Sequence, residues 1–253
     1  MGKVMAIVNQ KGGVGKSTTA VNLGASISEL GKKVLLVDID PQGNATSGVS
    51  LDKSNLEKSI YDVLIEEVDI EESIIPTDIT NFHILPANID LAGAEIELVS
   101  MMSRESKLKR VLDPVKEKYD YILIDCPPSL GLLTLNALTA ADGVLVPIQC
   151  EYYALEGLGQ LIQTVNLVQK NLNSDLEIEG VLLTMYDART NLSQQVIDEV
   201  KNYFKNKVYE TIIPRNVRLS EAPSFGKPIT SYDSASTGAK AYRNLAKEVT
   251  GHE

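Results

Sequence analysis

Residues 10 to 18 read Gln10-Lys11-Gly12-Gly13-Val14-Gly15-Lys16-Ser17-Thr18, and this stretch decides the fold. An apolar run at 4–8 precedes it, and a helix-like run at 19–27 follows it. A glycine-rich loop between a strand and a helix lets backbone N–H groups surround phosphate oxygens, and the new helix points its positive end at the same anion. We therefore expect residues 12–18 to bind a nucleotide, with Lys16 on the β- and γ-phosphates and the Ser17 hydroxyl on Mg²⁺.

The loop departs from the usual phosphate-binding pattern at its first position. That pattern requires a glycine five residues before Gly15, where this chain has Gln10. Because Lys16 already serves the phosphates of its own site, the second lysine, Lys11, is placed to reach a nucleotide across an interface, as an arginine finger does. A dinucleotide site is disfavoured, since Thr18 stands where its third glycine is needed. A glycine-rich turn with incidental lysines is the remaining alternative, and it leaves both lysines unexplained.

Two carboxylates end the next apolar run, which begins at Val34. Asp38 and Asp40 stand at its end, before Pro41 and Gly43 interrupt the strand. Residues two apart in a strand share a face. One carboxylate is then placed to steer a Mg²⁺-bound water while the other orients the attacking water. The alternative is a pair of turn-forming acids at a strand end.

A second acid-terminated run spans 121–125. Its last residue, Asp125, matches the aspartate that holds Mg²⁺ in phosphate-loop enzymes, through water because Mg²⁺ keeps much of its hydration shell. Residues 127–131 are expected to form a loop that responds to the nucleotide. Taken alone, this run could be a strand ending in a turn, but the glycine loop upstream favours the metal role. Cys126 is expected to pack rather than to react, because no base is evident to activate it.

Apolar runs alternate with amphipathic segments along the chain. The expected strands are continuous apolar runs at 3–9, 33–39, 82–86, 120–125, 143–149, 179–185 and 208–213. The expected helices lie at 17–30, 58–67, 90–98, 103–118, 131–140, 156–171, 192–206 and 236–249. This order predicts an α/β, doubly wound, mostly parallel sheet with helices on both faces, in one domain spanning 1–253. Ligands bind such sheets at the carboxyl ends of the strands, where the motifs fall.

Composition narrows the class of protein further. The chain has 253 residues, 43% of them hydrophobic, which is enough for a substantial core. Its two cysteines form neither a metal pattern nor a disulfide framework, so a cytoplasmic location is expected. The net charge of −10 argues against bulk nucleic-acid binding, yet residues 200–253 carry nine Lys and Arg against five Asp and Glu. That basic segment is either a solvated helical surface or a local patch for an anionic partner.

The two-lysine loop K-G-G-x-G-K-[ST] resembles the deviant Walker A loop of the ParA/MinD family of ATPases. The runs 147–157, 184–190 and 212–223 extend the resemblance over nearly the whole chain and are similar to chromosomal, Soj-type ParA proteins. The resemblance implies a P-loop NTPase fold and ATP and Mg²⁺ as ligands. It implies a slow ATPase whose ATP-bound dimer sandwiches two nucleotides, each completed by Lys11 of the other copy.

The resemblance also implies roles for particular residues. Asp40 positions or activates the water, Asp38 supports the first switch, and residues 127–131 form the second switch. Pro214 and Asn216 are expected near the adenine, largely through backbone groups.

A partition ATPase of a chromosome or plasmid is the function that we expect. By the resemblance, ATP would switch on non-specific binding of double-stranded DNA, and a ParB-type centromere-binding partner would stimulate hydrolysis and release, giving a nucleoid-associated protein. Phosphate contacts need only clustered Lys and Arg, and Arg189, Arg218 and Lys227 are the candidates.

Three other classes remain open. A MinD-like membrane-recruited regulator of cell division needs an apolar amphipathic tail, whereas Leu245 and Val249 form only one packing stripe and membrane binding is not expected. A nucleotide-driven metabolic enzyme or reductase of the same superfamily would place cluster cysteines at a dimer axis, and Cys126 and Cys150 lie in other contexts. A small-molecule kinase leaves Lys11 without a role.

Overall fold

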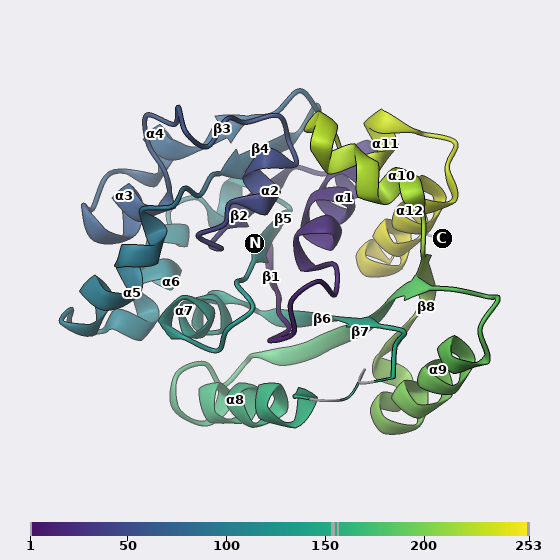
Figure 1. The fold of residues 1–253 in the computed structure, drawn as a ribbon. Helices are drawn as coiled ribbons and strands as arrows, with labels where there is room; N and C mark the ends of the chain where they lie inside the picture. Colours follow the sequence, from purple (N-terminus) through teal and green to yellow (C-terminus); the bar gives the residue numbers. More distant parts are fainter. Residues whose placement is uncertain (1, 153–154, 156, 252–253) are drawn as a thin grey trace.

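A single eight-stranded sheet organises the chain in the computed structural model, which describes residues 2–152, 155 and 157–251. The strand order is β3-β4-β2-β5-β1-β6-β7-β8 (Figure 1). All pairs are parallel except the short edge pair β3·β4. The sheet is therefore doubly wound, and the predicted fold class is confirmed.

The strands are short and mostly buried. Their bounds are β1 Lys3–Ile7, β2 Val34–Asp38, β3 Ile75–Pro76, β4 Phe82–Leu85, β5 Tyr121–Asp125, β6 Gly143–Gln149, β7 Glu177–Tyr186 and β8 Val208–Pro214. The seven predicted strands are all present.

Long helices connect most of these strands. Helices of nine residues or more are α1 Lys16–Glu29, α5 Leu91–Val99, α7 Leu132–Ala140, α8 Leu158–Asn171, α9 Asn191–Phe204 and α12 Thr237–Thr250. Shorter helices are α2 Asn44–Ser47, α3 Ile60–Ile65, α4 Ile70–Ser73, α6 Lys107–Leu112, α10 Val217–Glu221 and α11 Ile229–Tyr232. Single 3₁₀ turns lie at Arg104–Ser106, Lys116–Lys118, Lys205–Lys207 and Ala222–Phe225.

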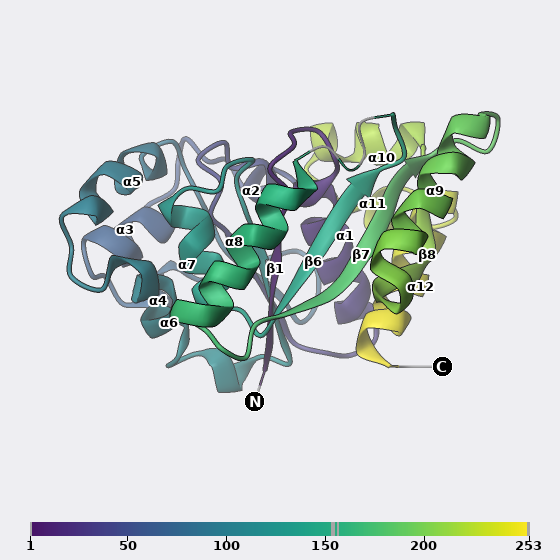
Figure 2. The ribbon, with the colours of Figure 1, turned by 90° about the horizontal axis from the view of Figure 1, so that it is seen from below.

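Apolar side chains fill both faces of the sheet. In β1, Val4 and Ala6 belong to the core on one face, and Met5 and Ile7 to the core on the other. Helices α1 and α12 cover one face and α7 and α8 the other, as Figures 1 and 2 show. This burial on both faces explains why the strands are continuous apolar runs rather than alternating ones.

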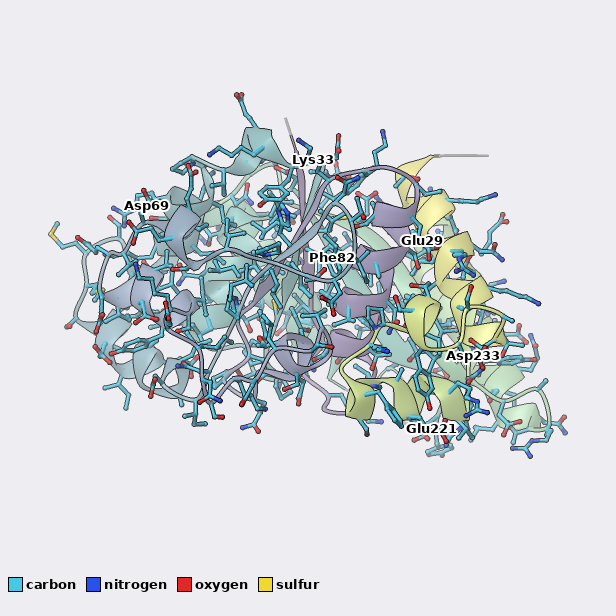
Figure 3. The ribbon with its side chains drawn as sticks, turned by 90° about the horizontal axis from the view of Figure 1, so that it is seen from above. Glu29, Lys33, Asp69, Phe82, Glu221 and Asp233 are labelled. Carbon is cyan, nitrogen blue, oxygen red and sulfur yellow. The ribbon has the colours of Figure 1, made fainter. Side chains whose placement is uncertain are left out.

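Helix α1 lies unusually close to the sheet. A Cβ added at Gly24 would stand 2.6 Å from the ring of Phe82 on β4, so only glycine permits this approach (Phe82 is labelled in Figure 3). At the far end of the same helix, Glu29 pairs with Arg243 of α12 at 2.6 Å. Both contacts fix α1, and with it the loop that precedes it.

The helix predicted at 103–118 is wrong in extent. The structure has a 3₁₀ turn, helix α6 and a second 3₁₀ turn there, because Pro114 lacks the N–H that a continuous helix needs. Helices α2, α4, α10 and α11 and strand β3 were not predicted. The first residue of the helix predicted at 156–171 lies outside the described residues, as do Tyr153 and Ala154 of the run 147–157.

Candidate nucleotide site

The glycine-rich loop joins β1 to α1 at the carboxyl edge of the sheet. Gly13 and Gly15 have φ of 74° and 91°, left-handed conformations that favour glycine. The N–H of Thr19 donates to the Gly15 carbonyl at 2.8 Å and begins the helix. Thr184, on β7, donates its hydroxyl to the Val14 carbonyl at 2.9 Å. The loop is thus shaped before any ligand arrives, with Val14 held beneath it.

A cleft of about 550 Å³ opens over this loop. Its walls come from the loop, the segment after β2, Pro128, Met185 and the C-terminal segment. The lining residues are Gly12, Gly13, Gly15, Lys16, Ser17, Thr18, Val21, Asn22, Asp40, Gln42, Asn44, Ser47, Gly48, Pro128, Met185, Pro223, Ser224 and Lys227. Most of the residues predicted to bind the nucleotide therefore meet in one cavity.

Lys16 and Asp125 bring opposite charges into the interior beside this cleft. The Lys16 ammonium donates to the Lys11 carbonyl at 3.2 Å, and burial lowers its pKa against the attraction of Asp125 and Asp40. Asp125 is fully buried, and burial, followed by the neighbouring Asp38 carboxylate, raises its pKa well above the usual range. Buried charges of this kind are costly unless a partner compensates them.

Neither carboxylate oxygen of Asp125 makes a hydrogen bond of ordinary geometry within the part of the chain that the structure describes, although the Ser17 hydroxyl is close enough to lower its pKa. Buried polar atoms are rarely left unpaired, and an ion or water is the ordinary explanation. The same described residues contain no group of three or more His, Cys, Asp or Glu that holds a metal unaided. Ser17, Asp125 and nucleotide phosphates together suit Mg²⁺, which takes one or two protein ligands and keeps its waters. The donors present fit a Mg²⁺–nucleotide complex.

Asp38 and Asp40 have different surroundings. Asp38 stands opposite Asp125 in the register of β2 and β5, and it is fully buried. It accepts hydrogen bonds from the N–H and the hydroxyl of Thr46, at 2.8 and 2.7 Å, and from the N–H of Asp40. Burial raises its pKa to about 6 despite these donors. Asp38 thus holds the segment after β2, while Asp40 lines the cleft and its carboxylate accepts the N–H of Gln42 at 2.9 Å.

Lys11 lies outside its own cleft. It lines a neighbouring surface hollow together with Pro128, Ser129 and Leu130 of the loop after β5. Gln10, in the place of the usual glycine, donates to the Gly157 carbonyl at 2.6 Å and so joins the loop to the segment after β6. Lys11 is half-exposed on this surface, in a position open to a second molecule.

Pro214 and Asn216 are not brought to the cleft. Asn216 is the N-cap of α10, accepting from the N–H of Arg218 at 2.8 Å and donating to Thr237 at 2.6 Å. Pro223 and Ser224, a few residues further along, line the cleft instead. Contact of residues 214 and 216 with the adenine remains a prediction.

The residues predicted to contact DNA lie in three different settings. Arg189, in the loop after β7, forms a two-pronged ion pair with Asp187 at 2.6 and 2.8 Å. Arg218 pairs with Glu221 at 2.9 Å and with Asp233 at 3.6 Å; both acids are labelled in Figure 3. Lys227 lines the nucleotide cleft.

Several residues that hold the walls of the cleft in place were missed from the sequence. Thr46 and Thr184 hold the loops from positions far along the chain, and Asn22 accepts the N–H of Ile229 at 2.6 Å, tying the C-terminal segment to α1. No local pattern marks such residues, since their roles depend on tertiary contacts. The packing of Cys126 was predicted, and Cys150 is buried as well: burial raises the pKa of Cys126 far above its usual range and that of Cys150 to about 11.

Comparison with known proteins decides the family. A family model described as an AAA domain matches residues 2–178. The sporulation initiation inhibitor protein Soj of Bacillus subtilis is 66% identical over 252 residues, covering 100% of both chains. The chromosome partitioning protein ParA of Myxococcus xanthus is 55% identical over 249 residues, covering 98% of this chain and 88% of that one. This chain belongs to the Soj/ParA family.

Solved structures share the fold of this chain. Cobyrinic acid a,c-diamide synthase of Mycobacterium smegmatis, with bound ADP and magnesium, matches with a TM-score of 0.88 and 42% identity, covering 100% of this chain and 95% of that one. The cell division ATPase MinD of Pyrococcus furiosus matches with a TM-score of 0.80 and 29% identity, covering 100% of both. The Soj/ParA chain therefore has the P-loop fold that its loop predicted.

Proposed function

We propose that this chain is an ATP-dependent partition ATPase that acts on a chromosome or plasmid, as a single ATPase domain. One observation carries the proposal: Lys16 lines a cleft built by a phosphate-binding loop, and the fully buried Asp125 lies behind it, its pKa raised by burial despite the nearby Lys16 charge. A Mg²⁺-bound triphosphate supplies a partner to each of them. The family supplies the biological role.

The residues of the site divide the chemistry between them. Lys16 and the loop N–H groups of residues 12–18 would hold the phosphates, and Ser17 and Asp125 would hold Mg²⁺. When bound, Mg²⁺ neutralises charge on the phosphate oxygens. Asp40, which lines the cleft, orients the attacking water, and Asp38 keeps the segment after β2 in place through Thr46. Positioning and charge neutralisation supply the rate enhancement.

The site is incomplete in one chain. Lys11 lies on the surface beside the loop after β5, away from its own cleft. In a face-to-face dimer this ammonium enters the partner's site and supplies positive charge where negative charge develops. An isolated subunit is therefore a slow ATPase, and two ATP molecules join the dimer.

DNA binding follows from dimerisation. Arg189, Arg215 and Arg218 all lie beyond the carboxyl ends of β7 and β8, each paired with an acidic side chain of its own subunit. Exposed ion pairs of this kind are weak and exchange readily for phosphate contacts. Dimerisation doubles the patch, so ATP controls affinity for non-specific double-stranded DNA. Lys227 contributes indirectly, from the wall of the nucleotide cleft.

A ParB-type protein completes the cycle by stimulating hydrolysis, which returns the dimer to monomers in the cytoplasm, near the nucleoid.

The membrane-recruited alternative is not favoured. In helix α12, the residues Ala239, Tyr242, Leu245 and Ala246 are buried against the body of the protein. Their apolar face is therefore not free to enter a membrane. No helix among the described residues is long and apolar enough to cross a bilayer.

The metabolic-enzyme alternative is also not favoured. The chain is 50–66% identical to partition proteins over nearly its full length, compared with 42% for the diamide synthase structure.

Retention of DNA tests the proposal directly. The protein is applied to immobilised duplex DNA of unrelated sequence with Mg-ATP, with Mg-ADP or without nucleotide. We expect retention only with Mg-ATP, decreasing steeply as salt rises. Equal retention under all three conditions would contradict an ATP-controlled partition function.

A further inference from the structure

Gln10 occupies the position where the usual phosphate-binding loop has its first glycine. Its φ is not positive, so the shape of the backbone there does not require glycine. The side chain is half-buried, and its amide Nε2 atom donates to the Gly157 carbonyl at 2.6 Å. Gln10 therefore ties the start of the loop to the residue that precedes helix α8.

Gly157 is shaped for this contact. It is the N-cap of α8, and its φ of 78° is a left-handed conformation that favours glycine. A Cβ added there would stand 2.0 Å from Nε2 of Gln10 and would displace the amide. The absence of a side chain at residue 157 is thus what lets the glutamine reach the carbonyl.

The residues on either side of Gln10 are also held. Asn9 is buried, and its amide group donates to the Pro147 carbonyl of β6 at 2.7 Å. The Oδ1 atom of Asn9 accepts the N–H of Lys11 at 2.9 Å, and the Lys11 carbonyl accepts the Lys16 ammonium at 3.2 Å. Both polar groups of the Lys11 backbone are therefore bonded, and Gln10 adds a tether immediately before it.

The tether and the Lys11 side chain share one surface. Both line the hollow of about 520 Å³ beside the loop after β5, together with Gly157 and Gln160 from the start of α8. Because the side chain of a lysine is a flexible stem, the position of its backbone decides which points the ammonium can reach. The Gln10 tether lies one residue from that backbone.

We propose that Gln10 is a positioning residue for Lys11, which it aims at the nucleotide of the other copy. The inference rests on the proposed function, in which Lys11 completes the partner's site. Gln10 lines the surface hollow rather than its own nucleotide cleft, so it acts through Lys11. A positive charge that is already in place stabilises developing negative charge without the cost of reorganisation.

The competing role for Gln10 is to brace the loop of its own subunit. The two roles predict defects at different sites of the dimer. A tether for Lys11 affects the nucleotide held by the partner, whereas a brace affects the nucleotide held by the same subunit. The same substitution, placed in one or the other subunit of a mixed dimer, separates them.

The test uses Gln10→Gly, which restores the glycine of the usual loop and removes the tether. The reference is an equimolar mixture of Lys11→Ala and Asp40→Ala, combined before ATP is added. Its one complete site uses Asp40 of the first chain and Lys11 of the second. In the donor arm, Gln10→Gly is added to the Asp40→Ala chain, which supplies Lys11. In the acceptor arm, it is added to the Lys11→Ala chain, which holds the ATP that is hydrolysed.

We expect the donor arm to hydrolyse ATP at least about tenfold more slowly than the reference, because a lysine with a mobile backbone is misplaced in the partner's site. The acceptor arm keeps the reference rate, and Gln10→Gly alone binds ATP with the native Kd. Gln10→Glu in the donor chain keeps the length of the side chain but lacks the amide donor, and it gives the same loss. Gln160→Ala, in the same hollow, is the matched control and keeps the reference rate in either arm.

A donor arm as fast as the reference would overturn the positioning role while leaving Lys11 as the group that acts on the partner's site. A loss confined to the acceptor arm, or equal in the two arms, would assign Gln10 to its own loop and overturn the positioning role as well. A reference mixture no faster than its components would instead count against the proposed function of Lys11 and remove the basis for a role of Gln10.

Discussion

Thr46 binds Asp38 twice, through its N–H at 2.8 Å and its hydroxyl at 2.7 Å, both on the same carboxylate oxygen. The hydroxyl of Thr46 also accepts the N–H of Ala87 at 3.0 Å. All of these atoms are buried. One threonine thereby joins the end of β2, helix α2 and the segment after β4 behind the nucleotide cleft.

Replacing Thr46 by valine should destabilise the protein. Thr46→Val keeps the shape but leaves a buried carboxylate with one donor fewer and the Ala87 N–H without an acceptor, which costs about 1–3 kcal/mol. Thr46→Ser keeps the hydroxyl and should cost less. Urea unfolding of the three proteins measures the difference, and equal stability of Thr46→Val and the native chain would show that this contact is not important.

Replacing Asp125 by asparagine should separate stability from ligand binding. Because burial and the neighbouring Asp38 carboxylate outweigh the Ser17 hydroxyl and the Lys16 charge in raising the pKa of Asp125, Asp125→Asn relieves a cost and should leave the ligand-free protein as stable as the native chain or about 1–2 kcal/mol more stable. It should also remove most of the extra stabilisation by Mg-ATP, about 2.7 kcal/mol at a ligand concentration 100 times Kd.

Thermal unfolding with no ligand, with ATP and EDTA, and with Mg-ATP measures both effects for Asp125→Asn. The EDTA arm is the control, since ATP without the metal should shift the unfolding of the native and variant proteins by similar amounts. A strongly destabilised ligand-free variant, or one that Mg-ATP stabilises fully, would contradict the assigned role of Asp125.

The paired arginines should contribute to DNA binding without affecting the chemistry. Arg189→Ala and Arg218→Ala should each weaken ATP-dependent DNA retention across all sequences and lower the salt dependence, because each removes phosphate contacts. Basal ATP hydrolysis should not change. Lys240→Ala, at an exposed position of α12, is the matched control. Unaltered retention and salt dependence in both variants would place the DNA surface elsewhere.

Much of the fold was predictable because its signals are local. Continuous apolar runs indicated the buried strands, and the spacing of glycines and lysines at residues 10–18 indicated the phosphate loop. The helix predicted at 103–118 was wrong in extent because Pro114 interrupts an otherwise amphipathic pattern. Helix α2, only four residues long, carries too short a pattern to recognise.

The site was predictable only where one strand end or one loop supplies it. Asp38 and Asp125 could be placed together because carboxyl ends of parallel strands share an edge. The partners of these residues could not, since Thr46 and Thr184 act through contacts distant in sequence. The part of the cleft wall formed by Pro223 and Ser224 depends on the path of the segment after β8, which returns to pack against α1. No local sequence pattern encodes that path.

We propose that each ATP is completed by Lys11 of the other copy. Lys11→Ala should bind ATP but neither dimerise nor hydrolyse it at the native rate. Asp40→Ala should remain an ATP-bound dimer, because its water is not oriented. Each variant retains the group that the other lacks.

Mixing Lys11→Ala with Asp40→Ala and measuring ATP hydrolysis is therefore the most direct test. In a mixed dimer, the Lys11→Ala subunit keeps Asp40 and receives Lys11 from its partner, which makes one complete site. We expect the mixture to hydrolyse ATP at a rate well above that of either variant alone. A Lys11→Ala protein that hydrolyses ATP at the native rate as a monomer, or a mixture no faster than its components, would contradict it.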